Sequence, residues 1–340
     1  MSASDRSDFS HIYVERQAEG YSLTQQILER FRSASIVQVD DYRHIFNRPR
    51  QRFQQQKQRM KLILAVKKEG FIYPGSENAQ DFGSPNFFYT TPILNCLYNC
   101  DYCFLQGMYA SANLVVFVNQ EDLLSAATRT TQNPPVKGSP VVLAISYNTD
   151  LLALESWLPL CRLWIEHARK TPDLLVEIRT KSANFRAIRD LQPPPNVVLA
   201  WTLSPSAVAT RYEHSAPPLE ARIRAARKAL DAGWQVRLCF DPLLPFGDTQ
   251  AVYGAFLQQV FEALPADRIR DVTTGVFRMS GAYFKTIQKV RSDCDLYYRP
   301  YDHQHGIVKL PGQEEDALMN WFEGQLLQHI ESDRLDIWRG

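Results

Sequence analysis

The chain has 340 residues, of which 45% are hydrophobic and 22% are charged, and its formal net charge is +1. This composition is typical of a globular protein and excludes collagen, a coiled coil and bulk disorder. No apolar run approaches the roughly 18 residues that a membrane-spanning helix needs. Residues 1–17 are polar and contain no apolar stretch of the secretory type. We therefore expect a cytoplasmic protein whose balanced charge gives it no general affinity for nucleic acid.

Residues 1–85 form a mixed, polar leader, which we expect to be an N-terminal extension. From residue 86 the pattern changes to short apolar runs separated by amphipathic stretches. Most of these runs are continuous rather than alternating, which is typical of parallel strands that are buried on both faces. The predicted strands are residues 87–94, 141–146, 174–179, 197–203, 234–240 and 272–277.

Helical patterns lie between the predicted strands. The clearest pattern follows Pro217 and Pro218, where an apolar residue recurs every three or four positions. Gly233 is the expected end of this predicted helix. The apolar face of that helix comprises Leu219, Ile223, Ala226 and Leu230. Six βα units in succession predict an α/β fold, either a partial barrel or an open sheet, over residues 86–292. Residues 293–340 form a C-terminal region that is expected to contribute substrate or nucleic-acid contacts.

In such folds the functional side chains follow the carboxyl ends of the strands, because the βα loops converge there. The segment after the first predicted strand contains Cys96, Cys100 and Cys103, spaced C-x3-C-x2-C. Soft thiolates select zinc, copper(I) or iron–sulfur clusters. Structural zinc sites usually have four ligands in paired C-x2-C units, whereas here a single triplet is present. A four-iron cluster held by three cysteines keeps one iron open for another molecule, so this spacing favours a [4Fe-4S] cluster.

Two alternatives remain for the cysteines at this point. They could be three buried structural thiols, or they could form a zinc site that a distant residue completes. The candidates for that fourth ligand are Cys161, Cys239, Cys294 and His167. With six cysteines in 340 residues the chain is too poor in cysteine for a disulfide scaffold.

The cysteine triplet after a first strand resembles the radical S-adenosylmethionine (SAM) superfamily. The segments CLYNCDYCFLQGMY, NTDLL, RTKS, WTLSPS and FDPLLP, in this order, are similar to the spore photoproduct lyase family. The resemblance implies a partial (β/α)6 barrel of TIM-like type, with an N-terminal extension and C-terminal helical and hairpin additions. It also implies a lyase-type enzyme with a [4Fe-4S] cluster and SAM as cofactors. Reductive cleavage of SAM would yield a 5′-deoxyadenosyl radical that abstracts hydrogen from a substrate, with a flavodoxin- or ferredoxin-type protein as the one-electron reductant.

The resemblance assigns roles to individual residues of this sequence. Cys96, Cys100 and Cys103 match the cluster ligands, and Lys181 matches a lysine that contacts the SAM carboxylate. The other positions expected near SAM are Tyr102, beside the adenine, and Thr149, Ser204 and Asp241. Without the resemblance, a lysine that follows a strand is as often solvated as it is a ligand-binding residue. A lone hydroxyl or acidic residue is then more often a helix cap or a turn residue than a binding residue.

Two positions depart from the family pattern. The family returns a hydrogen atom to the repaired thymine from a cysteine after the second strand, and this chain has Tyr147 there. A relay tyrosine that follows the last cluster cysteine is replaced by Phe104, which has no exchangeable hydrogen. These changes indicate that the hydrogen-return route is either missing or rebuilt. Tyr147 could supply a phenolic hydrogen, and Cys239 shares strand parity with Asp241, although a buried cysteine is usually a packing residue.

Two segments bear on nucleic-acid binding. Residues 43–61 contain seven Lys and Arg and no acid, so they could follow phosphates, with Phe46 and Phe53 as stacking surfaces. Without a groove motif, a solvated helix face is the better interpretation of such a run. Residues 297–301, with His303 and His305, match the family's DNA-contacting hairpin. The sequence therefore predicts a radical SAM enzyme with a nucleic acid or nucleotide as substrate, and the alternative is a zinc-stabilised, non-catalytic nucleic-acid-binding protein.

Overall fold

The computed structural model describes residues 9–75 and 80–338, and its main sheet has eight strands in the order β18-β14-β13-β11-β10-β9-β5-β4. The six central strands run parallel to one another, as expected from their continuous apolar sequences. All six residues of β11 are buried, for example. These strands are β5 (Phe87–Tyr89), β9 (Val141–Ala144), β10 (Leu174–Thr180), β11 (Val197–Thr202), β13 (Gln235–Leu243) and β14 (Asp271–Val276).

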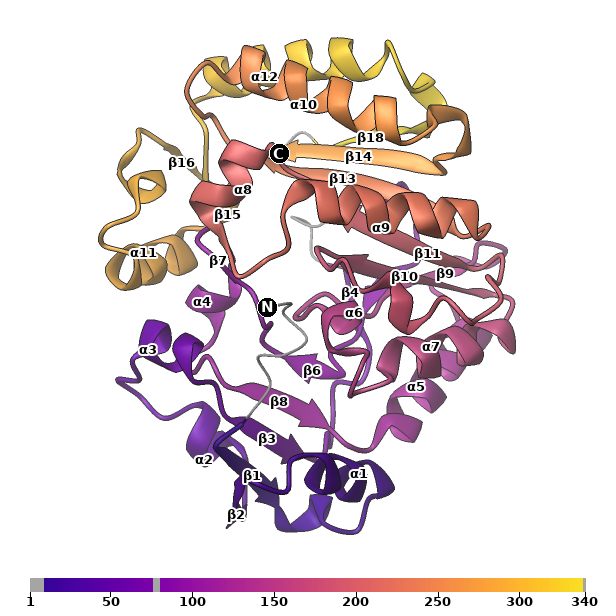
Figure 1. Ribbon diagram of the computed structural model, residues 1–340, viewed down its shortest axis with the longest axis vertical. Helices are drawn as coiled ribbons and strands as arrows, with labels where there is room; N and C mark the ends of the chain where they lie inside the picture. Colours follow the sequence, from indigo (N-terminus) through magenta and orange to yellow (C-terminus); the bar gives the residue numbers. More distant parts are fainter. Residues whose placement is uncertain (1–8, 76–79, 339–340) are drawn as a thin grey trace.

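The sheet curls into a partial barrel, and helices cover its outer face (Figure 1). The expected α/β class and partial barrel are therefore confirmed. The main covering helices are α5 (Gln120–Gln132), α7 (Leu160–Arg169), α9 (Leu219–Asp231) and α10 (Thr249–Ala263). The predicted apolar face of α9 is buried against the sheet, and Gly233 ends the helix with φ of +84°. None of the helices in the described ranges is long and apolar enough to cross a bilayer.

Short strands lie at both edges of the main sheet. β18 (Leu335–Ile337) pairs with β14 in parallel, so the end of the chain returns to the sheet. β4 (Tyr73–Pro74) pairs with β5 in the antiparallel direction at the other edge. The parallel array is thus extended by segments from the N-terminal and the C-terminal regions.

A second sheet joins the N-terminal region to the segments that flank the cysteines. Its order is β2-β1-β3-β8-β6, with only β6 antiparallel to its neighbour. Its strands are β1 (His11–Glu15), β2 (Ser35–Val39), β3 (Leu62–Ala65), β6 (Ile93–Leu94) and β8 (Leu114–Phe117). Because β6 precedes the cysteines and β8 follows them, this sheet fixes both ends of the cysteine loop (residues 95–104).

Short elements surround the cysteine loop. Strand β7 (Asn99–Cys100) lies within this loop and pairs with β12 (Glu213–His214). Helix α4 (Leu105–Met108) directly follows the loop. The N-terminal region adds helices α1 (Ser22–Arg30), α2 (Arg43–Phe46) and α3 (Phe53–Gln58). Figure 1 shows α3 near α4 on one side of the molecule.

The C-terminal region contains the expected hairpin and helix. β16 (Asp302–Gln304) and β17 (Ile307–Lys309) form the hairpin, and β17 also pairs with β15 (Arg278–Ser280). His305 and Gly306 form the turn with φ of 49° and 80°, values that favour glycine. Helix α11 (Gly281–Val290) precedes the hairpin, and α12 (Gly312–Leu326) follows the hairpin. Two short helices, α6 (Leu151–Leu154) and α8 (Ser206–Tyr212), lie earlier in the chain.

Leu238 lies in the middle of β13, and its side chain has no exposed surface. We expect Leu238→Ala to lower the free energy of unfolding by about 2–5 kcal/mol, because the lost methyl groups leave a cavity in a close-packed core. Chemical denaturation followed by circular dichroism measures the change. Val136→Ala, at a side chain that is 44% exposed, is the control and should stay within about 0.5 kcal/mol of the parent. Equal effects of the two variants would contradict the placement of β13 in the core.

Candidate active site

A cavity of about 500 Å³ lies at the carboxyl ends of the parallel strands. Its wall contains residues that follow or end all six of the central parallel strands, together with the cysteine loop. The volume is in the range of small-molecule and cofactor sites. The strand-end residues include Ser146, Tyr147, Thr149 and Asp150 after β9, Thr180 and Lys181 from β10, Thr202 from β11, and Asp241 and Pro242 from β13. The chain therefore places its polar side chains where the topology of a βα array predicts them.

Cys96, Cys100 and Cys103 all line this cavity, although they come from one short loop. Burial raises the pKa of the Cys96 thiol to about 12 and also raises the pKa of Cys100. The thiolate forms therefore require nearby positive charge. A metal centre supplies that charge, since a coordinating thiol is deprotonated. Three sulfur donors on one cavity wall fit an iron–sulfur cluster.

Across the part of the chain that the structure describes, no three His, Cys, Asp or Glu side chains converge closely enough to ligate one metal ion. An iron–sulfur cube binds each cysteine through a different iron, so its ligands stand farther apart than those of one ion. The residues considered for a fourth zinc ligand also lie away from the cavity wall: Cys161, Cys239, Cys294 and His167.

The cysteine loop is held by side chains from distant parts of the sequence. Lys57 on α3 donates hydrogen bonds to the carbonyl oxygens of Cys96 and, at 2.9 Å, of Tyr98. Arg291, at the end of α11, forms an ion pair with Asp101, with 2.7 Å between Nη1 and Oδ1. The hydroxyl of Tyr297 donates to the carbonyl oxygen of Asp101 at 2.7 Å, and Arg291 donates to that of Asn99 at 3.0 Å. The backbone turn that presents the thiols is therefore determined by tertiary contacts.

Lys181 belongs to a buried group of polar side chains beside Cys100. Its Nζ lies 3.9 Å from Oε1 of Glu213 and 5.2 Å from the centre of the Tyr102 ring. Burial alone would lower the pKa of Lys181, but the Cys100 thiol and the Glu213 carboxylate outweigh burial and raise it. Lys181 is therefore a stable positive charge at the cavity wall, suited to a carboxylate ligand.

Glu213 joins two of the predicted SAM-site residues to a buried arginine. Tyr102 and Ser204 both donate hydrogen bonds from their hydroxyls to Glu213, at 3.0 Å for Ser204, and Arg222 forms an ion pair with the same carboxylate. Ser204 itself does not line the cavity. Its contact is therefore with the carboxylate that supports Lys181. The sequence offered no signal for Glu213, because its partners are separated by up to 111 positions.

Thr149 and Asp241 both lie at the cavity wall, in different settings. Oγ1 of Thr149 is buried and has no hydrogen-bond partner within the described ranges. Such a hydroxyl requires a partner, so a ligand in the cavity fits it. Asp241 instead pairs with Arg278 through two contacts of 2.9 and 3.3 Å, and the Arg278 guanidinium stacks on Trp338 at 3.7 Å.

The two positions that depart from the family pattern are in contact with each other. The rings of Phe104 and Tyr147 lie 5.8 Å apart at the cavity wall. Tyr147 also stacks on Tyr89, with 4.3 Å between ring centres, and Tyr89 stacks on Tyr73 at 5.0 Å. Tyr147 is therefore held by aromatic neighbours at the cavity. Cys239 is fully buried and does not line the cavity, and burial raises its pKa to about 12.

We expect Arg291→Met to lower the free energy of unfolding by about 1–3 kcal/mol, because the buried Asp101 carboxylate loses its arginine partner and keeps only His214, at 3.0 Å. The variant should also retain less iron after anaerobic reconstitution, since the cysteine loop loses its support. Denaturant unfolding and iron analysis measure the two effects. Arg16→Met is the control, because the Arg16–Asp40 pair is 70% and 77% exposed, and it should cost less than about 1 kcal/mol. A variant as stable and as rich in iron as the control would show that the pair does not hold the loop.

The amino-acid sequence of this chain matches one family of known proteins. Residues 9–294 match the family model described as "Spore photoproduct lyase". A spore photoproduct lyase from Bacillus subtilis (strain 168) is 22% identical over 330 residues, which cover 93% of this chain and 94% of the relative. One from Geobacillus sp. (strain Y412MC61) is 21% identical and covers 90% of this chain and 91% of the relative.

Solved structures share the fold. A mutant spore photoproduct lyase with bound AdoMet and dinucleoside spore photoproduct superposes with a TM-score of 0.81 at 16% identity. The match covers 97% of this chain and 98% of that chain. The likeness therefore extends through the N-terminal sheet, the partial barrel and the C-terminal additions.

Proposed function

Because the chain belongs to the spore photoproduct lyase family of radical SAM enzymes, we propose that it cleaves SAM reductively at a [4Fe-4S] cluster in this cavity and acts on a nucleic acid or nucleotide. The observation that carries the proposal is the convergence of three thiols and the Lys181 ammonium on one cavity wall. When bound, the cluster and SAM would supply one electron and a 5′-deoxyadenosyl radical. The protein would bind, orient and shield them.

Different residues of the chain would bind different groups of SAM. Lys181 would pair with the SAM carboxylate, while Glu213 keeps its ammonium in place. The unpartnered Thr149 hydroxyl would bind a polar group of the same molecule, and Tyr102 would pack beside the adenine. Ser204 would act through Glu213, and Asp241 would contact SAM while Arg278 fixes its carboxylate.

A dinucleotide photoproduct is the substrate class that we propose first. A solved relative contains both AdoMet and a dinucleoside spore photoproduct. In this chain the cavity wall contains aromatic rings suited to bases, among them Tyr89, Phe104 and Tyr147. The hairpin of β16 and β17 would contact the strand that carries the lesion, with Tyr298 as a ring that is 60% exposed.

Tyr147 is the group that we propose for hydrogen return. Its phenolic O–H would break as a C–H bond forms on the substrate radical, which leaves a tyrosyl radical. That radical would then take one electron from the reductant and one proton from water. Stacking on Tyr89 would hold the ring at the cavity during this exchange. Cys239 is the second candidate donor, and its complete burial makes it the less accessible of the two.

Cys100→Ala should abolish 5′-deoxyadenosine formation and lower the iron content, because one cluster ligand is lost. The measurement is anaerobic reconstitution with iron analysis, followed by a 5′-deoxyadenosine assay under dithionite. Cys161→Ala removes an equally buried thiol away from the cavity and should retain both iron and product. A parent protein that binds zinc and forms no 5′-deoxyadenosine would refute the proposed function and favour the zinc-stabilised alternative.

Tyr147→Phe should still form 5′-deoxyadenosine but should lose transfer of solvent hydrogen to the product. With dinucleoside photoproduct in D₂O, the parent should give a thymine product that carries deuterium, because the phenolic hydrogen exchanges with solvent. Mass spectrometry of the product measures the transfer. Tyr109→Phe is the control, since Tyr109 bonds to Asn148 at 2.9 Å and does not line the cavity. Equal deuterium in the Tyr147→Phe product would exclude Tyr147 as the donor.

A further inference from the structure

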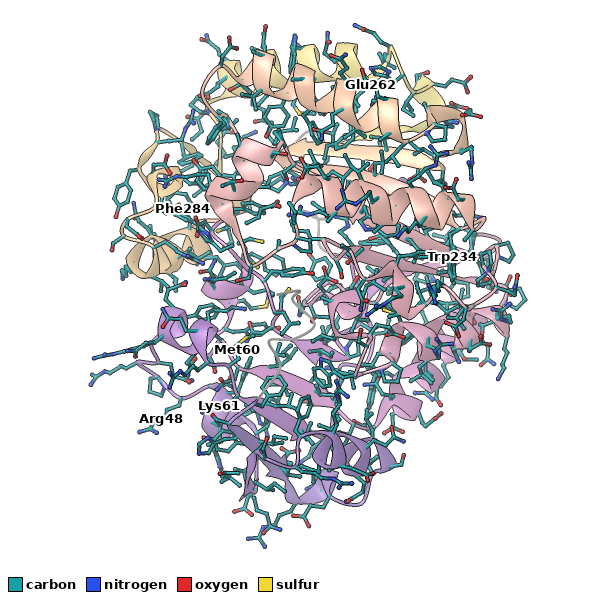
Figure 2. The ribbon with its side chains drawn as sticks, viewed as in Figure 1. Arg48, Met60, Lys61, Trp234, Glu262 and Phe284 are labelled. Carbon is teal, nitrogen blue, oxygen red and sulfur yellow. The ribbon has the colours of Figure 1, made fainter. Side chains whose placement is uncertain are left out.

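Four arginines on either side of α3 in the sequence form an exposed basic surface. We call Arg48, Arg50, Arg52 and Arg59 the α3 basic patch, and all four are exposed. Figure 2 shows Arg48 pointing away from the body of the molecule. Neighbouring arginines such as Arg43 are paired with an acid, but no carboxylate in the described ranges forms an ion pair with any of these four. The patch is therefore a concentration of positive charge that is not neutralised locally.

Helix α3 itself, which the patch flanks, contacts the cysteine loop. Lys57 binds the carbonyl oxygens of Cys96 and Tyr98, as described above. The side-chain amide of Gln54 lies 3.0 Å from that of Asn99, which stands next to Cys100. One short helix thus separates the basic patch from the loop that presents the thiols.

The patch lies outside the substrate cavity and lacks surfaces for stacking bases. No residue from 43 to 61 lines the cavity. Phe46 and Phe53, which were candidates for base stacking, are only 2% and 4% exposed, so that expectation is wrong. Single-stranded nucleic acid is usually bound by a basic groove together with exposed aromatic rings. The patch offers charge alone, beside the thiols.

We propose that the α3 basic patch is the docking surface for a small acidic one-electron carrier of the flavodoxin type. The inference rests on the proposed function, because the reaction needs one electron at the cysteine loop. Electron transfer falls steeply with distance, and α3 contacts that loop directly through Lys57. Complementary charge raises the rate of encounter and orients the carrier. The carrier loses one electron, and the cofactor gains it.

The test compares two reductants on one variant. In Arg48→Glu/Arg52→Glu/Arg59→Glu, 5′-deoxyadenosine formation driven by reduced flavodoxin should fall about tenfold or more, because charge steering is reversed. Formation driven by dithionite, a small reductant that needs no docking surface, should not change. The inhibition of the flavodoxin-driven rate by added salt should also be weaker in the variant.

A control with the same change in net charge is available in another part of the molecule. Arg186, Arg189 and Arg224 are also exposed, and they lie on or near α9 and β10 rather than α3. The triple exchange of these three to Glu should leave the flavodoxin-driven rate close to the parent rate. If both triple variants slow that rate equally, or if neither does, the docking proposal is overturned.

Direct binding separates this proposal from the proposed function. Fluorescence titration gives the affinity of each variant for flavodoxin and for a single-stranded oligonucleotide, with no need for turnover. A parent that forms no 5′-deoxyadenosine under dithionite contradicts the proposed function, while selective loss of flavodoxin affinity in the α3 variant still supports the patch. Unchanged flavodoxin affinity together with loss of oligonucleotide affinity would identify the patch as a nucleic-acid surface instead.

Discussion

The conformation of the cysteine loop is the constraint on which the site depends. Burial makes the Cys96 and Cys100 thiols costly to ionise, and the loop that presents the three cysteines is too short to have a core of its own. The buried Arg291–Asp101 pair and the Lys57 hydrogen bonds fix its carbonyl groups from two sides. Both partners of such a buried pair must be present, because either charge alone would be strongly unfavourable.

The electrostatics of the cavity follow from the same principle. Glu213 is buried with Lys181 and Arg222, and these two cations lower its pKa although burial alone would raise it. Asp241 is similarly matched by Arg278. The charges at the wall are thus oriented before any ligand binds, which reduces the reorganisation that binding and chemistry require.

The N-terminal region is part of the site and not only an extension. Its strands share a sheet with β6 and β8, which enclose the cysteine loop, and α3 contacts that loop directly. The division at residue 85, drawn from a change in composition, remains a prediction about domains, and it does not coincide with a boundary between the two sheets. Composition reports where the pattern of burial changes, whereas sheet membership depends on pairing between distant segments.

The sequence by itself determined the class of the fold, the strands of the parallel sheet and the apolar face of α9, because these depend on local periodicity. It also determined the cysteine triplet and its metal preference, since spacing and donor type are local properties. It could not identify Glu213, Arg291, Lys57 or Tyr89 as parts of the site. Their partners lie 39 to 192 positions away in most of the contacts that hold the site, as for Lys57 with Cys96 and Arg291 with Asn99. Only the tertiary structure decided that one face of a basic segment supports the thiols while the other faces solvent, because burial is a property of packing and not of charge.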